Sequence, residues 1–197
     1  MANKDNLFDN WIFVDETSCW LNECPIYIWR PVGENPEPSG VSSGVRIKLN
    51  LWGCISCRGA SDFVTFSNNM DQYNYLEILA GDFLPFAKTT YGDNFILHQD
   101  NDPKHASFLC SEFLKTNGII WSKAPSNSPD LNPIEMVWAD MKKHIASKLC
   151  KTLEELKLAI WEYRQSLTAE KCTVYITHLR EKVIPAVISR NGGWSNM

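Results

Sequence analysis

Short apolar runs separated by polar turns fill the first third of the chain. Strands are expected at residues 10–15, 26–30, 45–56 and 63–66, because each run is apolar or β-branched and is bounded by polar or turn-forming residues. Residues 31–44 are rich in Pro, Gly and Ser and predict a long loop. The last two strands predict part of an antiparallel meander.

The apolar spacing becomes helical from about residue 71 onward. Tyr73, Leu76 and Leu79 recur at three-residue steps and predict a helix over residues 71–84. Pro85 is expected to end this helix, because proline lacks a backbone N–H and its ring collides with the preceding turn. A short apolar strand over residues 94–100 should follow.

A second helix is expected to begin at Asp102-Pro103, with Asp as the N-cap and Pro at the first helical position. It should end near Asn117-Gly118 and lead into a short strand over residues 119–121. From Pro133 onward the pattern is helical, with breaks expected near Thr152, Thr168 and Lys182. Strands first, then strand–helix alternation, then helices predict one α/β or α+β domain over residues 1–197, with a mixed sheet.

Composition narrows the classes of function. The net charge of −4 argues against a stand-alone nucleic-acid binder, although an enzyme that acts on nucleic acid through metal ions stays open. No uncharged apolar run reaches the roughly 18–20 residues of a membrane helix, and the polar start lacks an export signal. The seven cysteines are interpreted as reduced thiols of a cytosolic or nuclear protein, and Cys54 and Cys57 as buried thiols without a zinc partner pair.

Three acids stand where a shared metal site could form. Asp15 and Asp100 each close a predicted strand, and Glu135 lies in the first turn of a predicted helix. Strand ends at one edge of a sheet gather ligand groups in α/β folds. Carboxylate oxygens are ligands that Mg²⁺ prefers, and two such ions can drive phosphoryl transfer.

Each acid also has a purely structural explanation. Asp15 could start the turn after its strand, and Asp100 could belong to the turn that leads to Pro103. Glu135 stands three residues after Asn132, as in a capping box at a helix N-terminus. Position along the sequence alone leaves both explanations open.

Longer motifs resemble those of mariner-type DDE transposases. The segment Ser128-Pro-Asp-Leu-Asn-Pro-Ile-Glu135 is similar to the signature around that family's third acid. Gln99-Asp-Asn-Asp-Pro-Lys-His105 resembles the motif of its second aspartate, and Trp11-Ile-Phe-Val-Asp15-Glu16 the segment of its first. The resemblance covers nearly the whole chain, and the octapeptide is its most specific part.

The resemblance implies a ribonuclease-H-like fold: a mixed five-stranded sheet flanked by helices, with extra C-terminal helices. It implies that Asp15, Asp100 and Glu135 are the catalytic, metal-binding acids, and that Mg²⁺ or Mn²⁺, as two ions, is the cofactor. The expected reaction is DNA strand cleavage and strand transfer in the nucleus, with transposon ends and target DNA as partners and with a homodimer to be tested. Asn101, His105 and Asn132 are expected to support the site.

Two features qualify this expectation. Position 102 is usually small in the family, so Asp102 is interpreted as a cap rather than as a fourth ligand. The family's N-terminal helix-turn-helix region, which recognises DNA ends, is expected to be absent from this chain. Lys142 and Lys143, on the Glu135 helix, are candidates for DNA-backbone contacts or simply part of a solvated face. The alternative function is therefore an inactive or host-adopted remnant that serves as a DNA-binding or protein-interaction module.

Overall fold

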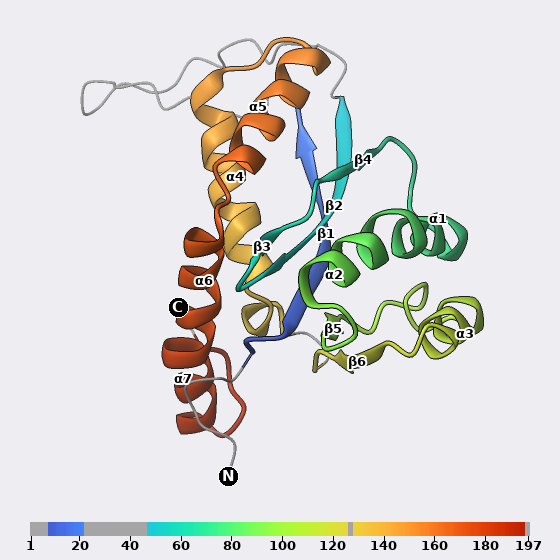
Figure 1. Ribbon diagram of the computed structural model, residues 1–197. Coiled ribbons are helices and arrows are strands. Elements are labelled where there is room, and N and C mark those ends of the chain that lie inside the picture. The colour runs from blue at the N-terminus through green and yellow to red at the C-terminus, as the bar shows by residue number, and fades with distance from the viewer. Residues whose placement is uncertain (1–7, 22–46, 126–127, 196–197) are drawn as a thin grey trace.

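A mixed sheet with helices on both faces forms the centre of the molecule (Figure 1). The computed structural model describes residues 8–21, 47–125 and 128–195. The sheet order is β3-β2-β1-β5-β6, with β4 also pairing β2; β1 runs antiparallel to β2 and parallel to β5, which is parallel to β6. Its strands are β1 (Trp11–Trp20), β2 (Lys48–Ser56), β3 (Gly59–Ala60), β4 (Val64–Phe66), β5 (Ile96–Gln99) and β6 (Ile120–Lys123). The predicted strand at residues 26–30 and the loop at 31–44 lie outside the described residues.

Within the described residues, the sheet has six strands where five were expected, because two short strands share one edge of β2. Ala60 pairs with Ile55, whereas Val64 pairs with Trp52, so the register shifts by one residue between β3 and β4. Such a shift marks a bulge, and here it divides one edge strand into two pieces. The ribonuclease-H-like architecture is otherwise as expected.

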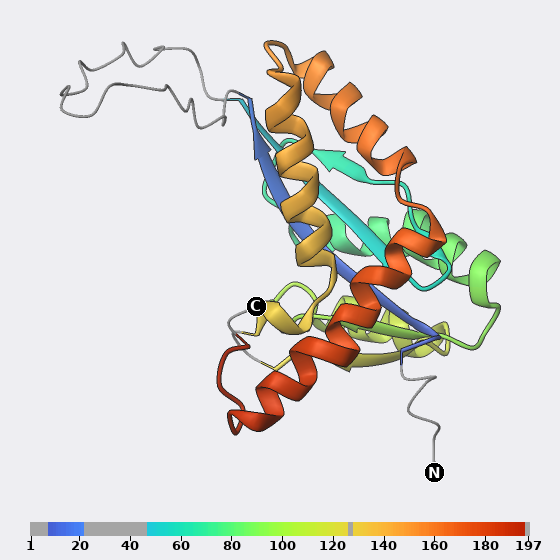
Figure 2. The same cartoon turned by 90° about the vertical axis from the view of Figure 1, so that its left-hand side faces the viewer.

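Period-two alternation along β1 supplies two separate cores. Phe13 packs with α4 (Ile134–Lys148), α5 (Leu153–Gln165) and α6 (Ala169–His178) on one face of the sheet. Ile12 and Val14 pack with α1 (Gln72–Ile78), α2 (Leu84–Tyr91) and α3 (Phe108–Thr116) on the other. Figure 2 shows α4 and α6 lying across the first face. Residues that follow Phe13 on β1 therefore point alternately to the two sides.

Strand β1 is longer than predicted. It pairs with β2 as far as Trp20, opposite Lys48, so Asp15 lies in the middle of the strand and does not close it. The sequence prediction stopped at the first acid, but the polar residues after it are only partly buried and remain in the ladder. Pairing with β5 ends at Phe13, so the backbone of β1 beyond that point has β2 as its strand partner.

Contrary to the sequence prediction, the helices continue where breaks were expected. The helix continues through Pro85, because the preceding turn, Leu79–Phe83, widens into a π-helix in which the Leu84 N–H donates to the Leu79 carbonyl. The predicted break near Lys182 is replaced in the same way by a π-helical turn, Leu179–Val183, directly before α7 (Ile184–Ser189) and its Pro185. A widened turn accommodates the proline ring that a regular helix would reject.

The predicted start of the second helix is also wrong. Asp102-Pro103 opens a single turn closed by Ala106 N–H on the Asp102 carbonyl, and α3 begins only at Phe108, with Ser107 as N-cap. Its end at Asn117 and the N-caps Thr152 and Thr168 agree with the sequence prediction. Within the described ranges, no helix is long and apolar enough to cross a membrane.

The two candidate zinc-motif cysteines are free thiols. Cys54 is fully buried in β2, and burial raises the pKa of its thiol to about 12. A thiol that stays protonated is a poor metal ligand. The interpretation as a buried thiol is confirmed for Cys54, whereas Cys57 is a free thiol that is only partly buried.

Candidate active site

All three candidate acids line one pocket of about 370 Å³ beside the C-terminal end of β5 and the N-terminal end of α4. The pocket also takes side chains from the loop after β5 and from the segment before α4. Its polar lining includes Asp15, Asp100, Asn101, Asp102, Asn132 and Glu135. The fold therefore brings together acids that lie far apart in the sequence.

Asp15 points to the α4 side of the sheet, as Phe13 does. Its Oδ1 accepts a hydrogen bond from the Glu16 N–H at 2.8 Å. The pKa of Asp15 is raised to about 8, first by burial and then by the negative charges of Glu135 and Glu16. Without a cation, this carboxyl group holds its proton near neutral pH.

The approach of α4 to Asp15 depends on a glycine. Gly53 is the β2 residue opposite Asp15, and a Cβ at this position would lie 2.5 Å from Cδ1 of Phe63. The absence of a side chain lets the Phe63 ring meet buried Trp138 of α4 edge-on, with 5.0 Å between ring centroids. Trp138 lies one turn after Glu135, so this contact sets the position of Glu135 relative to β1.

Glu135 lies in the first turn of α4, but the predicted capping box does not form. The N-cap is Pro133, which makes no side-chain cap hydrogen bond. The Asn132 Nδ2 instead donates to the Val14 carbonyl at 3.1 Å and ties the start of α4 to β1. Capping therefore does not explain Glu135, which stays exposed beside the pocket.

Asp100 is held by its own loop. Its Oδ1 accepts from the Asp102 N–H at 3.0 Å and lies 2.5 Å from Nδ1 of buried His105. The hydrogen bond to His105 is the main reason that the pKa of Asp100 lies below its ordinary value. Among the described residues, no donor contacts Oδ2 of Asp100.

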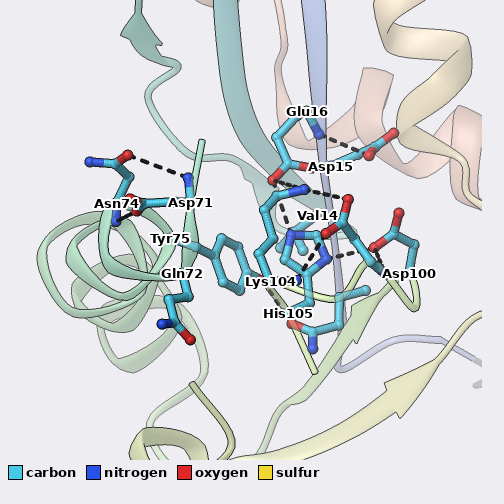
Figure 3. A network of polar contacts seen from close by, with 12 residues as sticks. Val14, Asp15, Glu16, Asp71, Gln72, Asn74, Tyr75, Asp100, Lys104 and His105 are labelled. Carbon is cyan, nitrogen blue, oxygen red and sulfur yellow. Dashed lines mark hydrogen bonds and ion pairs between the residues drawn. The ribbon is translucent and has the colours of Figure 1, made fainter. Parts of the chain in front are cut away.

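His105 bridges two carboxylates (Figure 3). Its Nε2 lies 3.0 Å from Oε1 of Glu16, and the centroids of the His105 and Tyr75 rings lie 4.1 Å apart. Burial lowers the pKa of His105, but the hydrogen bonds to Asp100 and Glu16 outweigh burial and raise the pKa to about 9. The ring is therefore a doubly protonated link between the two acids at neutral pH.

Asn101 and Asp102 shape the loop that carries Asp100. The Asn101 Nδ2 donates to the Ala124 carbonyl at 2.5 Å and joins the loop to the end of β6. The Asp102 carboxylate accepts from the Lys104 N–H at 2.9 Å and pairs with the Lys104 ammonium at 2.8 Å. Asp102 therefore caps a turn, although not the helix that the sequence predicted.

The three acids share a pocket without forming a closed ligand set. Among residues 8–21, 47–125 and 128–195, no group of three His, Cys, Asp or Glu side chains is arranged to hold a metal ion. Asp15 and Glu135 interact with each other, whereas Asp100 turns its Oδ1 to His105. The role of the three acids as metal ligands stays a prediction.

Glu16, for which no function was expected from the sequence, contacts His105 and lies 3.6 Å from the Lys104 ammonium. The alternation of β1 was the available signal, because the residue after Asp15 must face the α3 side of the sheet. Of the two candidate lysines, Lys143 pairs with Asp140 at 3.0 Å, and Lys142 is exposed. Lys142 lies two helical turns after Glu135 and so shares its side of α4.

Known proteins are similar to this chain in both sequence and fold. Residues 10–157 match the family described as DDE superfamily endonuclease. The transposable element Tcb2 transposase of Caenorhabditis briggsae is 34% identical over 141 residues, which cover 69% of this chain and 52% of that protein. The chain therefore spans about half the length of this curated relative.

Solved structures agree on the architecture. The Mos1 transposase paired-end complex with left transposon end superposes with a TM-score of 0.82 at 16% identity, over 98% of this chain and 58% of that one. The Mos1 mariner paired end complex with Mn gives a TM-score of 0.78 at 17% identity, over 94% and 56% of the two chains. The family match and these structures confirm the resemblance to mariner-type transposases: the chain belongs to the DDE superfamily endonuclease family.

Proposed function

We propose that this chain is the catalytic part of a transposase that cuts and joins DNA strands with divalent metal ions. Asp15, Asp100 and Glu135 would hold Mg²⁺ or Mn²⁺, as two ions. The observation that carries the proposal is their convergence on one pocket from β1, the loop after β5 and the start of α4. Carboxylate oxygens are typical ligands of hard cations such as Mg²⁺.

The chemistry of the pocket fits a cation. The pKa of Asp15 is raised by burial and by Glu135, so a positive charge between these carboxylates would relieve their repulsion. The Asn132 Oδ1 is buried and has no hydrogen-bond partner among the described residues, which leaves an oxygen donor at the pocket wall. Bound metal would supply activation of the attacking oxygen and stabilisation of the leaving oxygen at phosphorus.

The protein's own contribution is positioning. His105 and the Asp102 N–H hold Oδ1 of Asp100, so that Oδ2 is the oxygen available to a ligand. Asn132 and Asn101 fix the start of α4 and the Asp100 loop to the sheet. Phosphoryl transfer needs little more than such positioning and charge stabilisation.

DNA is the proposed substrate and partner. The relatives are transposases, and Mos1 has been solved as a paired-end complex with a transposon end and in complexes with Mn and with Mg. Lys142 and Lys143, which follow Glu135 along α4, would contact the DNA backbone. A homodimer that holds two ends, and action in the nucleus, complete the proposal.

The second candidate is an inactive remnant that keeps the fold as a DNA-binding or protein-interaction module. The favouring observation is that, over the described ranges, no three potential ligands are arranged to hold an ion. This candidate predicts DNA or protein binding that is indifferent to divalent metal.

Metal-dependent melting and DNA nicking test the proposed function. Mn²⁺ should raise the melting temperature of the unmodified chain and support nicking of a plasmid or a transposon-end duplex. Asp100→Ala should abolish both effects, because it removes one of the three ligands. Glu77→Gln, an exposed acid on α1, is the matched control and should behave as the unmodified chain. Melting and nicking that ignore Mn²⁺ would favour the remnant.

A further inference from the structure

The alternation of β1 gives two adjacent acids two different surroundings. Asp15 points toward α4 and Glu135, whereas Glu16 points to the face covered by α1 and α3. Glu16 reaches the turn between β5 and α3, where it meets His105 and Lys104 (Figure 3). The same strand therefore contributes to the pocket directly through Asp15 and to its supporting layer through Glu16.

His105 is fixed at both ends of its ring. Glu16 Oε1 lies 3.0 Å from Nε2, and Asp100 Oδ1 lies 2.5 Å from Nδ1. Both acceptors are carboxylates, so the ring donates a proton at each nitrogen. Tyr75 packs on the ring and donates its hydroxyl to Oε1 of Gln99 at 2.7 Å, which holds the stacking ring in place.

Lys104 holds the Glu16 end of this row of hydrogen-bonded side chains in place. Its ammonium lies 3.6 Å from Oε1 of Glu16 and 2.8 Å from Oδ2 of Asp102, and its side chain is only 16% exposed. The Glu16 side chain is 18% exposed, and its carboxylate lies between two cationic donors. A largely buried carboxylate in this position resists rotation and so fixes the histidine ring that it accepts from.

We propose that Glu16 is a positioning residue of the pocket: it orients His105, and His105 in turn holds Asp100 with Oδ2 turned to the ligand. This inference rests on the proposed function, because it assigns Asp100 to metal. Partners behind a liganding carboxylate typically contribute about 10–100-fold to metal affinity or activity. Glu16 acts through His105 and need not touch the metal or the DNA.

The first experiment measures Mn²⁺ affinity of the full chain by electron paramagnetic resonance, together with metal-dependent nicking. Glu16→Ala should weaken Mn²⁺ binding about tenfold or more. Glu16→Gln keeps an oxygen acceptor at the same reach and should recover most of the affinity. Glu112→Ala, which removes an exposed acid paired with Lys115 on α3, is the control and should bind as the unmodified chain.

A double-variant cycle tests the route through His105. Once His105→Ala has removed the link, adding Glu16→Ala should cause no further loss of affinity. A structural role of Glu16 elsewhere in the fold would instead give additive losses. Additive losses would contradict the inference.

Nitrogen-15 spectra of the metal-free chain give a readout that needs no metal. The unmodified chain should show two slowly exchanging ring N–H protons of His105, and Glu16→Ala should lose the Nε2 proton and broaden the Nδ1 proton. Normal Mn²⁺ affinity and an unchanged Nδ1 proton in Glu16→Ala would overturn the role of Glu16 while the proposed function stands. Failure of the unmodified chain to bind Mn²⁺ would overturn the proposed function, and the role of Glu16 at a metal site with it.

Discussion

Asp15 and Glu16 are chemically similar neighbours whose surroundings oppose each other. Asp15 lies beside a second acid, and its pKa is raised to about 8 by burial, Glu135 and Glu16. Glu16 lies beside His105 and Lys104, which supply positive charge. Because side chains alternate along the strand, Asp15 faces another acid and is suited to bind a cation. Glu16 faces positively charged side chains and is suited to hold them in place.

Asp15→Asn should stabilise the metal-free protein at neutral and alkaline pH. The carboxyl has a pKa of 3.8 when unfolded and of about 8 when folded, so its contribution to stability is greatest below pH 4 and is lost as the pH rises to 8. We expect the variant to melt about 3 °C or more above the unmodified chain at pH 8, with little difference at pH 4. Melting curves at both pH values check this, and a lower melting temperature at pH 8 would contradict it.

At the scale of elements, one glycine couples the sheet to α4. Gly53 makes room for Phe63 against Trp138, and Trp138 lies one turn from Glu135. The π-helical turn before Pro85 has a comparable packing role on the other face of the sheet, because it places Leu79 and Phe83 in the core. Local departures from regular structure thus position the helices that flank the site.

Gly53→Ala should destabilise the fold and reduce the proposed activity. Its Cβ would lie 2.5 Å from the Phe63 ring, so the ring and Trp138 must move apart, at a cost of about 1–3 kcal/mol. Gly81→Ala is the control, because nothing lies within 4 Å of a Cβ there and alanine favours the helix. Urea unfolding of both variants measures the difference; equal stability would show that α4 does not depend on the glycine.

At the scale of the whole molecule, the sequence predicted the order of elements, the two-faced sheet and the pocket acids better than the element boundaries. Apolar period and motif order are local signals, whereas the turn before Pro85 and the continuation of β1 beyond Asp15 depend on packing and pairing with distant residues. The alternation of β1 indicates which face of the sheet Glu16 points to, but His105 lies 89 positions away, so no local pattern identifies it as the partner of Glu16. Asp102 is a second example: it caps a single turn, whereas the sequence pattern predicts the start of a helix there.

With a net charge of −4, the proposed binding of DNA should depend on a few well-placed cations. Lys142→Ala should weaken binding to a duplex uniformly across sequences and reduce the slope of log K against log salt by about one. Lys157→Ala, an exposed lysine on α5, should leave both quantities unchanged. Fluorescence anisotropy at several salt concentrations measures them, and identical slopes in the two variants would remove Lys142 from the interface.

We propose that β1, the loop after β5 and α4 together form one cation-binding pocket. Anomalous scattering from crystals soaked in Mn²⁺ locates the cation. We expect an anomalous peak within ligand distance of carboxylate oxygens of Asp15, Asp100 and Glu135, and no such peak in Asp100→Ala crystals. A map without a peak at the pocket, or a peak whose ligands exclude Asp15 and Glu135, would show that the three acids do not bind a common cation.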